Sequence, residues 1–429
     1  MRYTPAPQSL FIKNRLKFRE QMAPGSIAVF FSNYRVTVNA DMHYRFEQDS
    51  NFYYLAGLDQ EDCILFLFPE APQPKDREVL FIKPTNEHIQ VWEGWKYSVE
   101  EAREASGVET IKYLNSFESF MADALGRSQA VYLDFNEHSR NSHYTVSRAH
   151  DYARELRKKF PGHQFRRAYP ILAKLRMKKE PEEIEVMRQA CKITEIAFRK
   201  VLEVTQPGKW EYEIEGEIRK QFVANRGTKP AYEPIVATGA NACVLHYNLS
   251  HSQLNAGELM LMDFGTEYAN YSSDLSRTIP VNGRFTDRQR AVYEAVLRVQ
   301  QNAIARLRPG TDFQEYKKAA DQDMEQELLQ LGLIAQKDID EAPNDKPAFK
   351  KYFMHGLSHH IGLDTHDVGD FHITLEPGMV FTVEPGIYIP EENIGIRLEN
   401  DVVVTNDEPD DLMADIPIQP DEIEALMNS

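Results

Sequence analysis

The sequence predicts two domains of different classes. Residues 1–174 are expected to form an α/β domain, and residues 175–429 an α+β domain in which helices back a curved antiparallel sheet. Two observations indicate this division. Strand-like and helix-like segments alternate in the first part, whereas in the second part apolar runs occur in pairs joined by short polar connections, as in hairpins. With 429 residues, 42% of them hydrophobic, the chain can form two separate cores.

The first domain combines β-like apolar segments with helix-like segments. The β-like segments are residues 26–31, 63–68, 79–82 and 130–133. The expected helices are residues 10–22, 99–105, 117–125 and 144–159. We expect the domain boundary between residues 174 and 180, because Pro181 suits the first turn of a new helix.

The second domain should begin with that helix, which runs to residue 202 before Pro207 and Gly208 stop it. Further helices are expected over residues 212–225, 287–307 and 315–331. After Asn406 the chain is acidic and interrupted by prolines, so we expect a partly ordered surface segment there.

Two aspartates flank the first predicted hairpin of the second domain. Asp263 ends the apolar run 259–262, and Asp274 precedes the run 275–279. The midpoint between the two aspartates lies in the turn-like segment 267–270. A hairpin folded at this midpoint is expected to set the two carboxylates across from each other.

The second hairpin repeats the arrangement with two glutamates. Glu384 ends the run 379–383, Glu399 follows the run 396–398, and the midpoint lies within residues 390–395. Directly opposed residues on antiparallel strands have Cα atoms roughly 4.5 to 5.5 Å apart. Like charges this close repel, so four clustered carboxylates require cations among them. The sequence therefore predicts a site for two divalent ions.

Composition excludes several other functions. The formal net charge is −17, from 49 basic and 66 acidic residues, and no basic stripe suited to nucleic acid is present. No apolar stretch approaches a membrane span, and the first residues lack the apolar core of a signal peptide, so we expect no membrane association and a cytoplasmic location. The three cysteines, Cys63, Cys191 and Cys243, are widely spaced, which argues against disulfides and a zinc–cysteine site.

Seven short motifs stand out in the second domain: VATG at 236–239, LHY at 245–247, MDFG at 262–265, SDLSRT at 273–278, HGLSH at 355–359, TVEPG at 382–386 and IRLEN at 396–400. Together they resemble the motifs of the proline-specific metallopeptidases with the pita-bread fold, and among these the Xaa-Pro aminopeptidase (aminopeptidase P) family. Residues 44–57 resemble the family's N-terminal signature, and residues 422–426 its C-terminal end. The resemblance implies a creatinase-like N-terminal domain and a pita-bread C-terminal domain.

The resemblance also implies a metal-ligand set. Its members are Asp263, Asp274, His359, Glu384 and Glu399. Asp274 and Glu399 would be the bridging carboxylates. Such an oxygen-rich site with one imidazole suits Mn²⁺, so we expect two Mn²⁺ per subunit, with Co²⁺, Fe²⁺ or Zn²⁺ as other possible occupants.

Roles in catalysis and substrate binding follow from the same resemblance. The catalytic residues would be Glu384, His366, His246 and Arg397. The substrate-binding residues would be His355, His366, His246 and Tyr388. The hypothesis is that metal-activated water attacks the carbonyl before proline, His366 helps to stabilise the oxyanion, Glu384 carries the proton and Arg397 orients carboxylates or His366.

Residues beside the motifs raise further expectations. His360 is left to packing, since adjacent side chains of an extended segment point apart. Tyr232, Tyr247 and Tyr388 lie next to the motifs, where each is as suited to the core as to contact with a proline ring. Trp92 and Trp95 are candidates for a subunit interface or the rim of the substrate site.

The predicted function is that of a metal-dependent exopeptidase, a hydrolase that releases the first residue from peptides with proline at the second position. The nearest alternative is prolidase, which shares the metal site but accepts only dipeptides. Methionine aminopeptidase would not need the long N-terminal domain, and a metal-free pita-bread binding module would not need all five ligands. Family analogy implies a homodimer or homotetramer.

Overall fold

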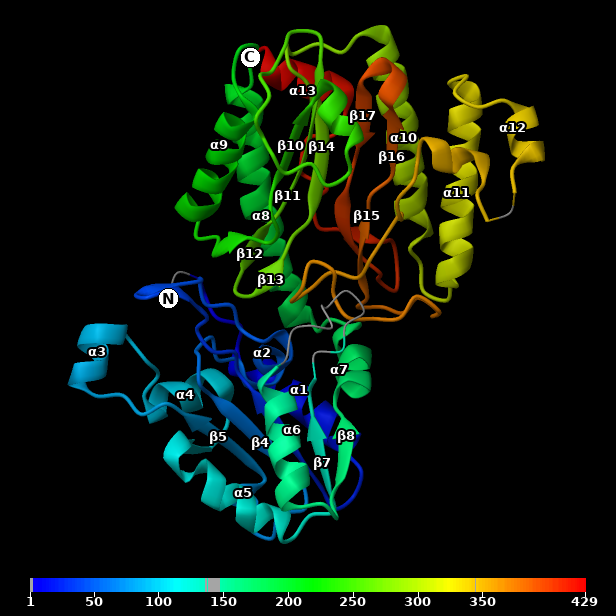
Figure 1. Ribbon diagram of the computed structural model, residues 1–429. Helices are drawn as coiled ribbons and strands as arrows, with labels where there is room; N and C mark the ends of the chain where they lie inside the picture. Colours follow the sequence, from blue (N-terminus) through cyan, green and yellow to red (C-terminus); the bar gives the residue numbers. More distant parts are fainter. Residues whose placement is uncertain (1–2, 136, 138–146, 344) are drawn as a thin grey trace. The chain divides into compact units, whose positions relative to one another are not determined.

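The computed structural model describes residues 3–135, 137, 147–343 and 345–429 (Figure 1). The chain divides into two compact units. One comprises Pro5–Arg176, and the other comprises Met177–Ser429 together with Tyr3 and Thr4.

The N-terminal unit is built on a six-stranded mixed sheet with the order β6-β5-β4-β1-β7-β8. The strands are β1 (Ser26–Phe31), β4 (Ile64–Leu67), β5 (Glu78–Ile82), β6 (Thr110–Tyr113), β7 (Ala130–Leu133) and β8 (Gln164–Arg167). A separate small hairpin pairs β2 (Thr37–Asn39) with β3 (Met42–His43). The helices are α1 (Gln8–Glu20), α2 (Ser50–Ala56), α3 (Glu87–Glu93), α4 (Val99–Ser106), α5 (Phe117–Leu125), α6 (Arg148–Lys159) and α7 (Tyr169–Arg176).

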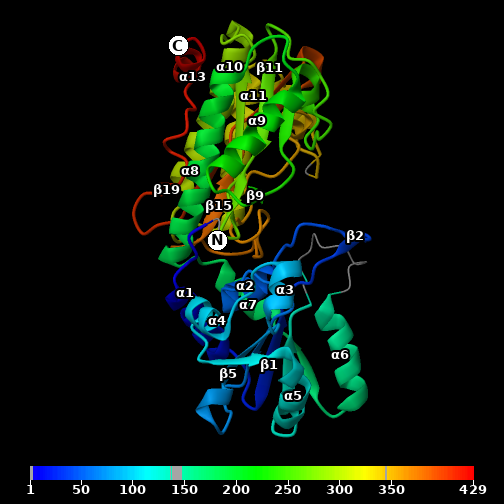
Figure 2. The ribbon, with the colours of Figure 1, turned by 90° about the vertical axis from the view of Figure 1, so that its left-hand side faces the viewer.

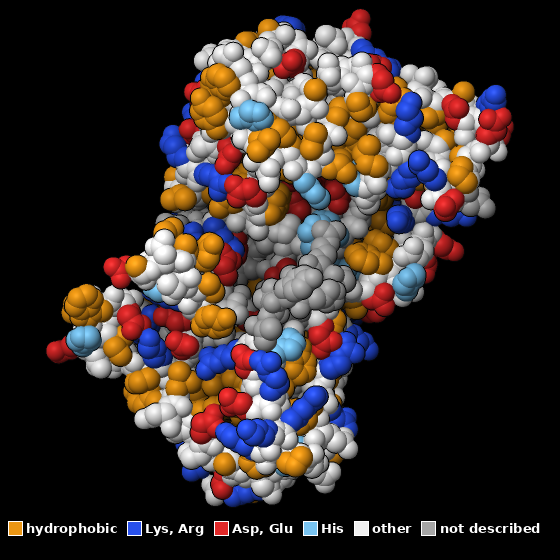
Figure 3. Space-filling model, viewed as in Figure 1, with side chains coloured by type: hydrophobic (Ala, Val, Ile, Leu, Met, Phe, Trp, Pro, Cys, Tyr) orange, Lys and Arg blue, Asp and Glu red, His pale blue; other side chains and the backbone are white. Residues whose placement is uncertain are grey.

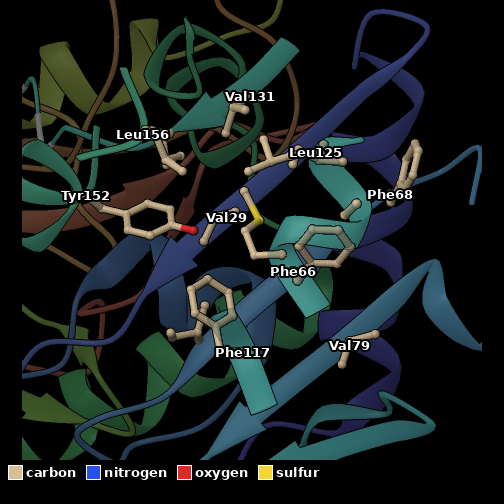
Figure 4. Packing of buried hydrophobic residues seen from close by; sticks show 14 of the residues in the cluster. Val29, Phe66, Phe68, Val79, Phe117, Leu125, Val131, Tyr152 and Leu156 are labelled. Carbon is tan, nitrogen blue, oxygen red and sulfur yellow. The ribbon is translucent and has the colours of Figure 1, made fainter. Parts of the chain in front are cut away.

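One face of this sheet packs against α5 and α6. Val29 of β1, Phe66 of β4 and Val131 of β7 point toward Phe117 of α5 and Tyr152 of α6 (Figure 4). The four β-like segments and the segments over 99–105 and 117–125 are confirmed with bounds close to those predicted. Residues 144–146 of the helix predicted over 144–159 lie outside the described residues, and the described part of this segment is α6.

The C-terminal unit places helices against antiparallel strands. Its helices are α8 (Pro181–Val204), α9 (Glu211–Ala224), α10 (Asp287–Arg306), α11 (Phe313–Gln330), α12 (Gln336–Glu341) and α13 (Pro420–Met427). Figures 1 and 2 show α8 and α9 lying together along one side of β10 (Ile235–Thr238), β11 (Leu259–Phe264) and β14 (Leu275–Pro280). The remaining strands are β9 (Lys229–Pro230), β12 (Thr266–Tyr268), β13 (Tyr271–Ser272), β15 (Val380–Val383), β16 (Gly386–Ile389), β17 (Ile394–Arg397), β18 (Asn400–Val403) and β19 (Asp410–Asp411).

The first hairpin forms, but its register differs from the one predicted. Asp263 lies opposite Ser276, not opposite Asp274. The tip explains the difference, because the turn is formed by Ala269 and Asn270, with φ of 49° and 69°. Moving the turn by one residue along the chain shifts the cross-strand pairing by two residues. The prediction of directly opposed aspartates was therefore wrong, although a two-residue shift keeps both side chains on one face of the hairpin.

Gly265 gives this hairpin its close packing. A Cβ atom at Gly265 would lie 1.7 Å from the carbonyl oxygen of Ser273, so no side chain fits. We expect Gly265→Ala to lower the free energy of unfolding by about 3 kcal/mol in urea titration, because rigid backbone must move. Gly216→Ala is the control: its Cβ meets nothing within 4 Å and it lies within α9, so it should be neutral or slightly stabilising. Equal stability of both variants would contradict this account.

The second hairpin has the predicted register. β15 pairs with β18 through Val383 and Asn400, and β16 pairs with β17 through Gly386 and Arg397. Both ladders share one register, which puts Glu384 opposite Glu399 at the junction between them. The backbone N–H of Glu399 also donates to the carbonyl of Ser276 (3.0 Å), so the two hairpins lie side by side.

The C-terminal tail is more ordered than predicted. It forms β19, which pairs with β18, and α13. Its apolar side chains Leu412, Met413, Ile416 and Ile423 are buried. The expectation of a partly ordered surface segment was therefore wrong, because these apolar residues outweigh the acidic character of the segment.

Candidate metal centre

Three predicted ligands from separate segments meet in the C-terminal unit. Asp274 follows the first hairpin turn, Glu399 lies in the second hairpin, and His359 pairs through its carbonyl with the N–H of Thr382 in β15 (3.0 Å). Asp274, His359 and Glu399 each offer a ligand atom, and these atoms lie within 4.8 Å of one another. All three residues are buried. Their geometry is therefore suitable for holding a metal ion.

The other two predicted ligands lie next to this group. The Nε2 atom of His359 is 3.6 Å from Asp274 Oδ2 and 3.8 Å from Glu384 Oε1. Asp263 reaches Asp274 through the hydroxyl of Tyr232, which lies 2.5 Å from Asp263 Oδ1 and also hydrogen-bonds to Asp274. The structure thus brings all five predicted ligands together.

The charges of this cluster favour a bound cation. Burial, together with the charge of Asp263, raises the pKa of Asp274 well above its ordinary value. Burial and neighbouring carboxylates likewise raise the pKa of Glu399 well above normal, and burial raises that of Glu384 to about 7. Four carboxylates and one imidazole form the donor set that hard divalent ions bind, so the residues present fit a metal.

Arg397 holds two of the carboxylates in place through hydrogen bonds. Its Nη2 donates to Asp263 Oδ2 (2.6 Å), and its Nε donates to Ser276 Oγ (2.8 Å). Ser276 in turn donates to Glu399 Oε2 (2.7 Å). Burial opposes the charge of Arg397, but Tyr388, Asp263 and Glu399 hold its pKa well above the usual range. Arg397 therefore remains a cation that orients one carboxylate directly and another through Ser276.

The predicted substrate histidines occupy different positions. The ring of His366 lies 3.9 Å from that of His359, between centroids, at an angle of 40°. His355 places Nε2 2.7 Å from the Tyr388 hydroxyl and Nδ1 3.7 Å from Glu384 Oε2. Burial lowers the pKa of His355 to about 3, so its imidazole is neutral at pH 7. His246 is exposed on the loop that follows the short helix Gly239–Cys243.

His360 packs away from the predicted ligands, as the sequence indicated. It is fully buried, and its ring lies 4.4 Å from that of Phe381. Its Nε2 is 3.0 Å from the carbonyl of Asp370. The difference between His359 and His360 follows from the extended backbone there, which directs successive side chains to opposite faces.

The three candidate tyrosines differ in their surroundings. Tyr388 is fully buried, with its hydroxyl between Arg397 and His355. Tyr247 and Tyr388 belong to one apolar cluster of the C-terminal unit. The hydroxyl of Tyr247 donates to Glu211 Oε2 (2.7 Å). Sequence reasoning missed the contact of Tyr232 with two predicted ligands, Asp263 and Asp274, because it considered this tyrosine only for the core or for contact with a proline ring.

Asp401 is a second residue next to the cluster that sequence reasoning missed. It is fully buried, and its Oδ2 accepts a hydrogen bond from the backbone N–H of Asp274 (3.1 Å). Burial, with the nearby charge of Asp274, raises the pKa of Asp401 well above normal. Asp401 therefore holds the backbone of the predicted ligand Asp274 in place. Only its place two residues after Glu399 could have indicated this role.

Figure 3 shows pale-blue histidine and red acidic side chains gathered on the viewed face of the C-terminal unit.

In the N-terminal unit, Trp92 and Trp95 are exposed, by 77% and 53%. Among the residues that the structure describes, no helix has the length and apolar character that crossing a bilayer requires.

Metal-free protein should lose stability as pH rises. Glu384 has a folded-state pKa raised from 4.5 to about 7, so the folded protein binds more protons than the unfolded chain between these values. Its contribution to the free energy of unfolding is complete below pH 4.5 and is lost as pH rises through 7. Thermal unfolding in chelator should show a falling Tm over this range. Added Mn²⁺ should raise Tm most at high pH, because metals compete with protons for these ligands.

The matched variant Glu384→Gln should weaken this pH dependence in chelator, because the amide does not titrate. A Tm that rises with pH in chelator, or an unchanged slope in Glu384→Gln, would contradict the assignment of raised pKa values to this cluster.

Comparison with known proteins gives consistent matches along the chain. Residues 185–406 match Metallopeptidase family M24, and residues 11–132 match Aminopeptidase P, N-terminal domain. The chain is 36% identical over 434 residues to an Xaa-Pro aminopeptidase of Escherichia coli, and this match covers 97% of both chains. It is 34% identical to an Xaa-Pro aminopeptidase of Haemophilus influenzae, with 98% of both chains covered.

Solved structures agree with the sequence matches. Aminopeptidase P from E. coli with the inhibitor Pro-Leu has a TM-score of 0.88 at 33% identity, with 99% of both chains covered. The Zn-substituted form of the E. coli enzyme, in complex with product, gives a TM-score of 0.89 at 33% identity, again over 99% of both chains. The two-domain prediction of fold class, with a pita-bread second domain, is thereby confirmed. The chain belongs to metallopeptidase family M24 and is a metal-dependent peptidase of the aminopeptidase P type.

Proposed function

We propose that this protein releases the first residue from peptides with proline at the second position, using two Mn²⁺ ions per subunit. The observation that carries the proposal is the convergence of Asp263, Asp274, His359, Glu384 and Glu399 in one cluster. Three of these residues are buried, and Asp263 and Glu384 are half-buried. Full-length similarity to Xaa-Pro aminopeptidases supports the exopeptidase activity and favours it over prolidase.

The donor set supports manganese. Four carboxylates and one imidazole are harder ligands than the thiolates that select zinc or copper, and they suit Mn²⁺. Two ions match the amount of negative charge, because Arg397 supplies only one positive charge to four acidic groups. A related enzyme has been prepared with zinc, so Zn²⁺, Co²⁺ and Fe²⁺ are the alternatives to test.

Bound divalent ions supply a Lewis acid and lower the pKa of water toward neutrality. The protein's own residues would then act on the peptide. Glu384, whose metal-free pKa is about 7, is suited to carry the proton to the departing proline nitrogen. His366, beside His359, is placed to donate to the oxyanion, and Arg397 keeps Asp263 in position.

The substrate-binding residues would be His355, His366, His246 and Tyr388. A bond to proline has no N–H and carries a rigid ring, so a peptidase that cleaves it needs a dedicated pocket rather than extended backbone pairing. Neutral His355, held by Tyr388, could line this pocket beside Glu384. His246 is exposed and free to meet the peptide.

We further propose a cytoplasmic homodimer or homotetramer with no nucleic-acid or membrane partner. The net charge of −17 supports the exclusion of nucleic acid. Trp92 and Trp95, which are exposed, are suited to a subunit interface or to the rim of the substrate site.

Product analysis separates the proposed activity from prolidase. Manganese-loaded protein is incubated with an Xaa-Pro dipeptide and an Xaa-Pro-Xaa tripeptide, with and without chelator. The proposal predicts release of the first residue from the tripeptide and its loss on chelation. Cleavage of the dipeptide alone would establish prolidase, and no metal-dependent cleavage of either would support a binding module.

A further inference from the structure

A buried charge pair lies in the C-terminal unit outside the ligand set. Lys179 Nζ donates to Asp367 Oδ2 at 2.9 Å, and both side chains are only 1% exposed. Lys179 precedes α8, and Asp367 directly follows His366 in the chain. Charges so thoroughly removed from water are stable only while they remain paired.

Backbone hydrogen bonds hold Lys179 in place. Its N–H donates to the carbonyl of Gly378 (2.8 Å), and the preceding Lys178 pairs with Met379, just before β15. The ammonium group also faces Glu183 in the first turn of α8, a buried carboxyl that Tyr271 hydrogen-bonds at 2.9 Å. Lys179 is therefore part of the rigid frame of the unit.

Asp367 is tied in a similar way to the segment that carries a ligand. Its backbone N–H donates to the carbonyl of His360 (2.9 Å), the residue after His359. Its Oδ1 accepts from the N–H of Val368 (3.0 Å). The chain between residues 360 and 367 is thus a closed loop that ends at the charge pair.

This loop has little room to move. A Cβ atom at Gly362 would lie 2.4 Å from Asp367 Oδ2 and 2.7 Å from Lys179 Cε. The carbonyl of Gly362 also accepts from the N–H of Ser272 (2.8 Å). Because residues 360–367 pack closely around the contact between Lys179 and Asp367, only one arrangement of this loop keeps the two charges paired.

We propose that Lys179 and Asp367 are positioning residues that hold His366 against His359 at the metal centre. The inference rests on the role proposed above for His366. Loss of either charge would leave its partner buried and unpaired, so the loop would shift to admit water. Because His366 is next to Asp367, its imidazole would move away from the position beside His359, while the five ligands would stay in place.

The test is a double-mutant cycle in full-length, manganese-loaded protein, using Asp367→Asn, His366→Ala and both together. Asp367→Asn should lower kcat about 10- to 100-fold, the usual effect of groups that orient catalytic residues. KM should change less, and bound metal should stay at the wild-type level. In the His366→Ala background, adding Asp367→Asn should change kcat less than about twofold, because the residue it positions is gone.

Lys179→Gln is an independent variant. It should lower kcat in wild-type protein and change kcat little in the His366→Ala background, as expected for Asp367→Asn. If either single variant fails to fold, the paired change Lys179→Met with Asp367→Leu is measured in its place. It leaves no buried charge unpaired, so the protein should fold, and loss of the hydrogen bond that ties Asp367 to Lys179 should still lower kcat when His366 is present and not in the His366→Ala background. Glu78→Gln is the control for lost ion pairing. It removes a 2.8 Å contact to fully buried Arg15 in the N-terminal unit and should lower Tm without changing kcat.

Two results would overturn the inference. The first is a wild-type kcat in Asp367→Asn. The second is a double variant whose fold-loss of kcat equals the product of the losses in the two single variants, because this would show that Asp367 acts independently of His366. Failure of the proposed function is distinguishable: full activity of His366→Ala by itself would remove the role of His366, whatever the charge pair does.

Discussion

Replacing Asp274 with alanine is expected to remove bound metal and activity together. Asp274 lies where ligand atoms from His359 and Glu399 meet, and its backbone is fixed by Asp401. Metal ions contribute several kcal/mol to hydrolysis, and about 1.4 kcal/mol is a factor of ten in rate. We therefore expect kcat/KM for an Xaa-Pro-Xaa peptide to fall by at least about 10³-fold, with metal content measured by mass spectrometry.

The matched control is Asp123→Ala, which changes an exposed aspartate on α5. This variant should keep both its metal and its activity. Asp274→Ala protein that binds the wild-type amount of manganese, or that retains wild-type turnover, would contradict the assignment of Asp274 as a ligand.

Replacing His366 with alanine should separate catalysis from metal binding. The His366 ring lies beside that of His359, but His366 is not one of the five predicted ligands. Removing one donor to an oxyanion typically lowers kcat about 10²- to 10³-fold. We expect a loss of that size with unchanged metal content, measured on the same protein preparation.

His372→Ala serves as the control, because His372 is exposed and lies outside the ligand cluster. Loss of metal in His366→Ala would show that His366 is a ligand. Full activity would show that oxyanion stabilisation comes from another group.

The sequence was sufficient to predict the second hairpin and its paired glutamates. Its two ladders keep one register around the junction, so the midpoint between Glu384 and Glu399 marks the turn correctly. The first hairpin could not be predicted as accurately. Ala269 and Asn270 adopt positive φ, but alanine gives no sequence signal for that conformation, and an error of one residue in the turn changes the pairing by two.

Contacts between segments distant in sequence were the least predictable part of the site. Tyr232 is 31 residues before Asp263 and 42 before Asp274, yet its hydroxyl meets both carboxylates. Lys179 and Asp367 are 188 residues apart. Local patterns of hydrophobicity and turn residues carry no information about such contacts, which arise only when the helices and hairpins pack together.

The order of the tail shows a related limit. Its prolines and acidic residues indicated a surface segment, but Arg277 donates to the carbonyl of Pro417 (3.0 Å) and Tyr293 to that of Ile418 (2.7 Å). These side chains come from β14 and α10. Their hydrogen bonds satisfy the backbone of a segment with little regular structure of its own.

The most direct test of the account is a manganese titration of metal-free protein, following both bound metal and release of the first residue from an Xaa-Pro-Xaa peptide. We predict no release without metal, activity that grows with added Mn²⁺, and a limit of two ions per chain. Cleavage that persists in fully metal-free protein would contradict the central claim, which is that Asp263, Asp274, His359, Glu384 and Glu399 form a catalytic metal centre.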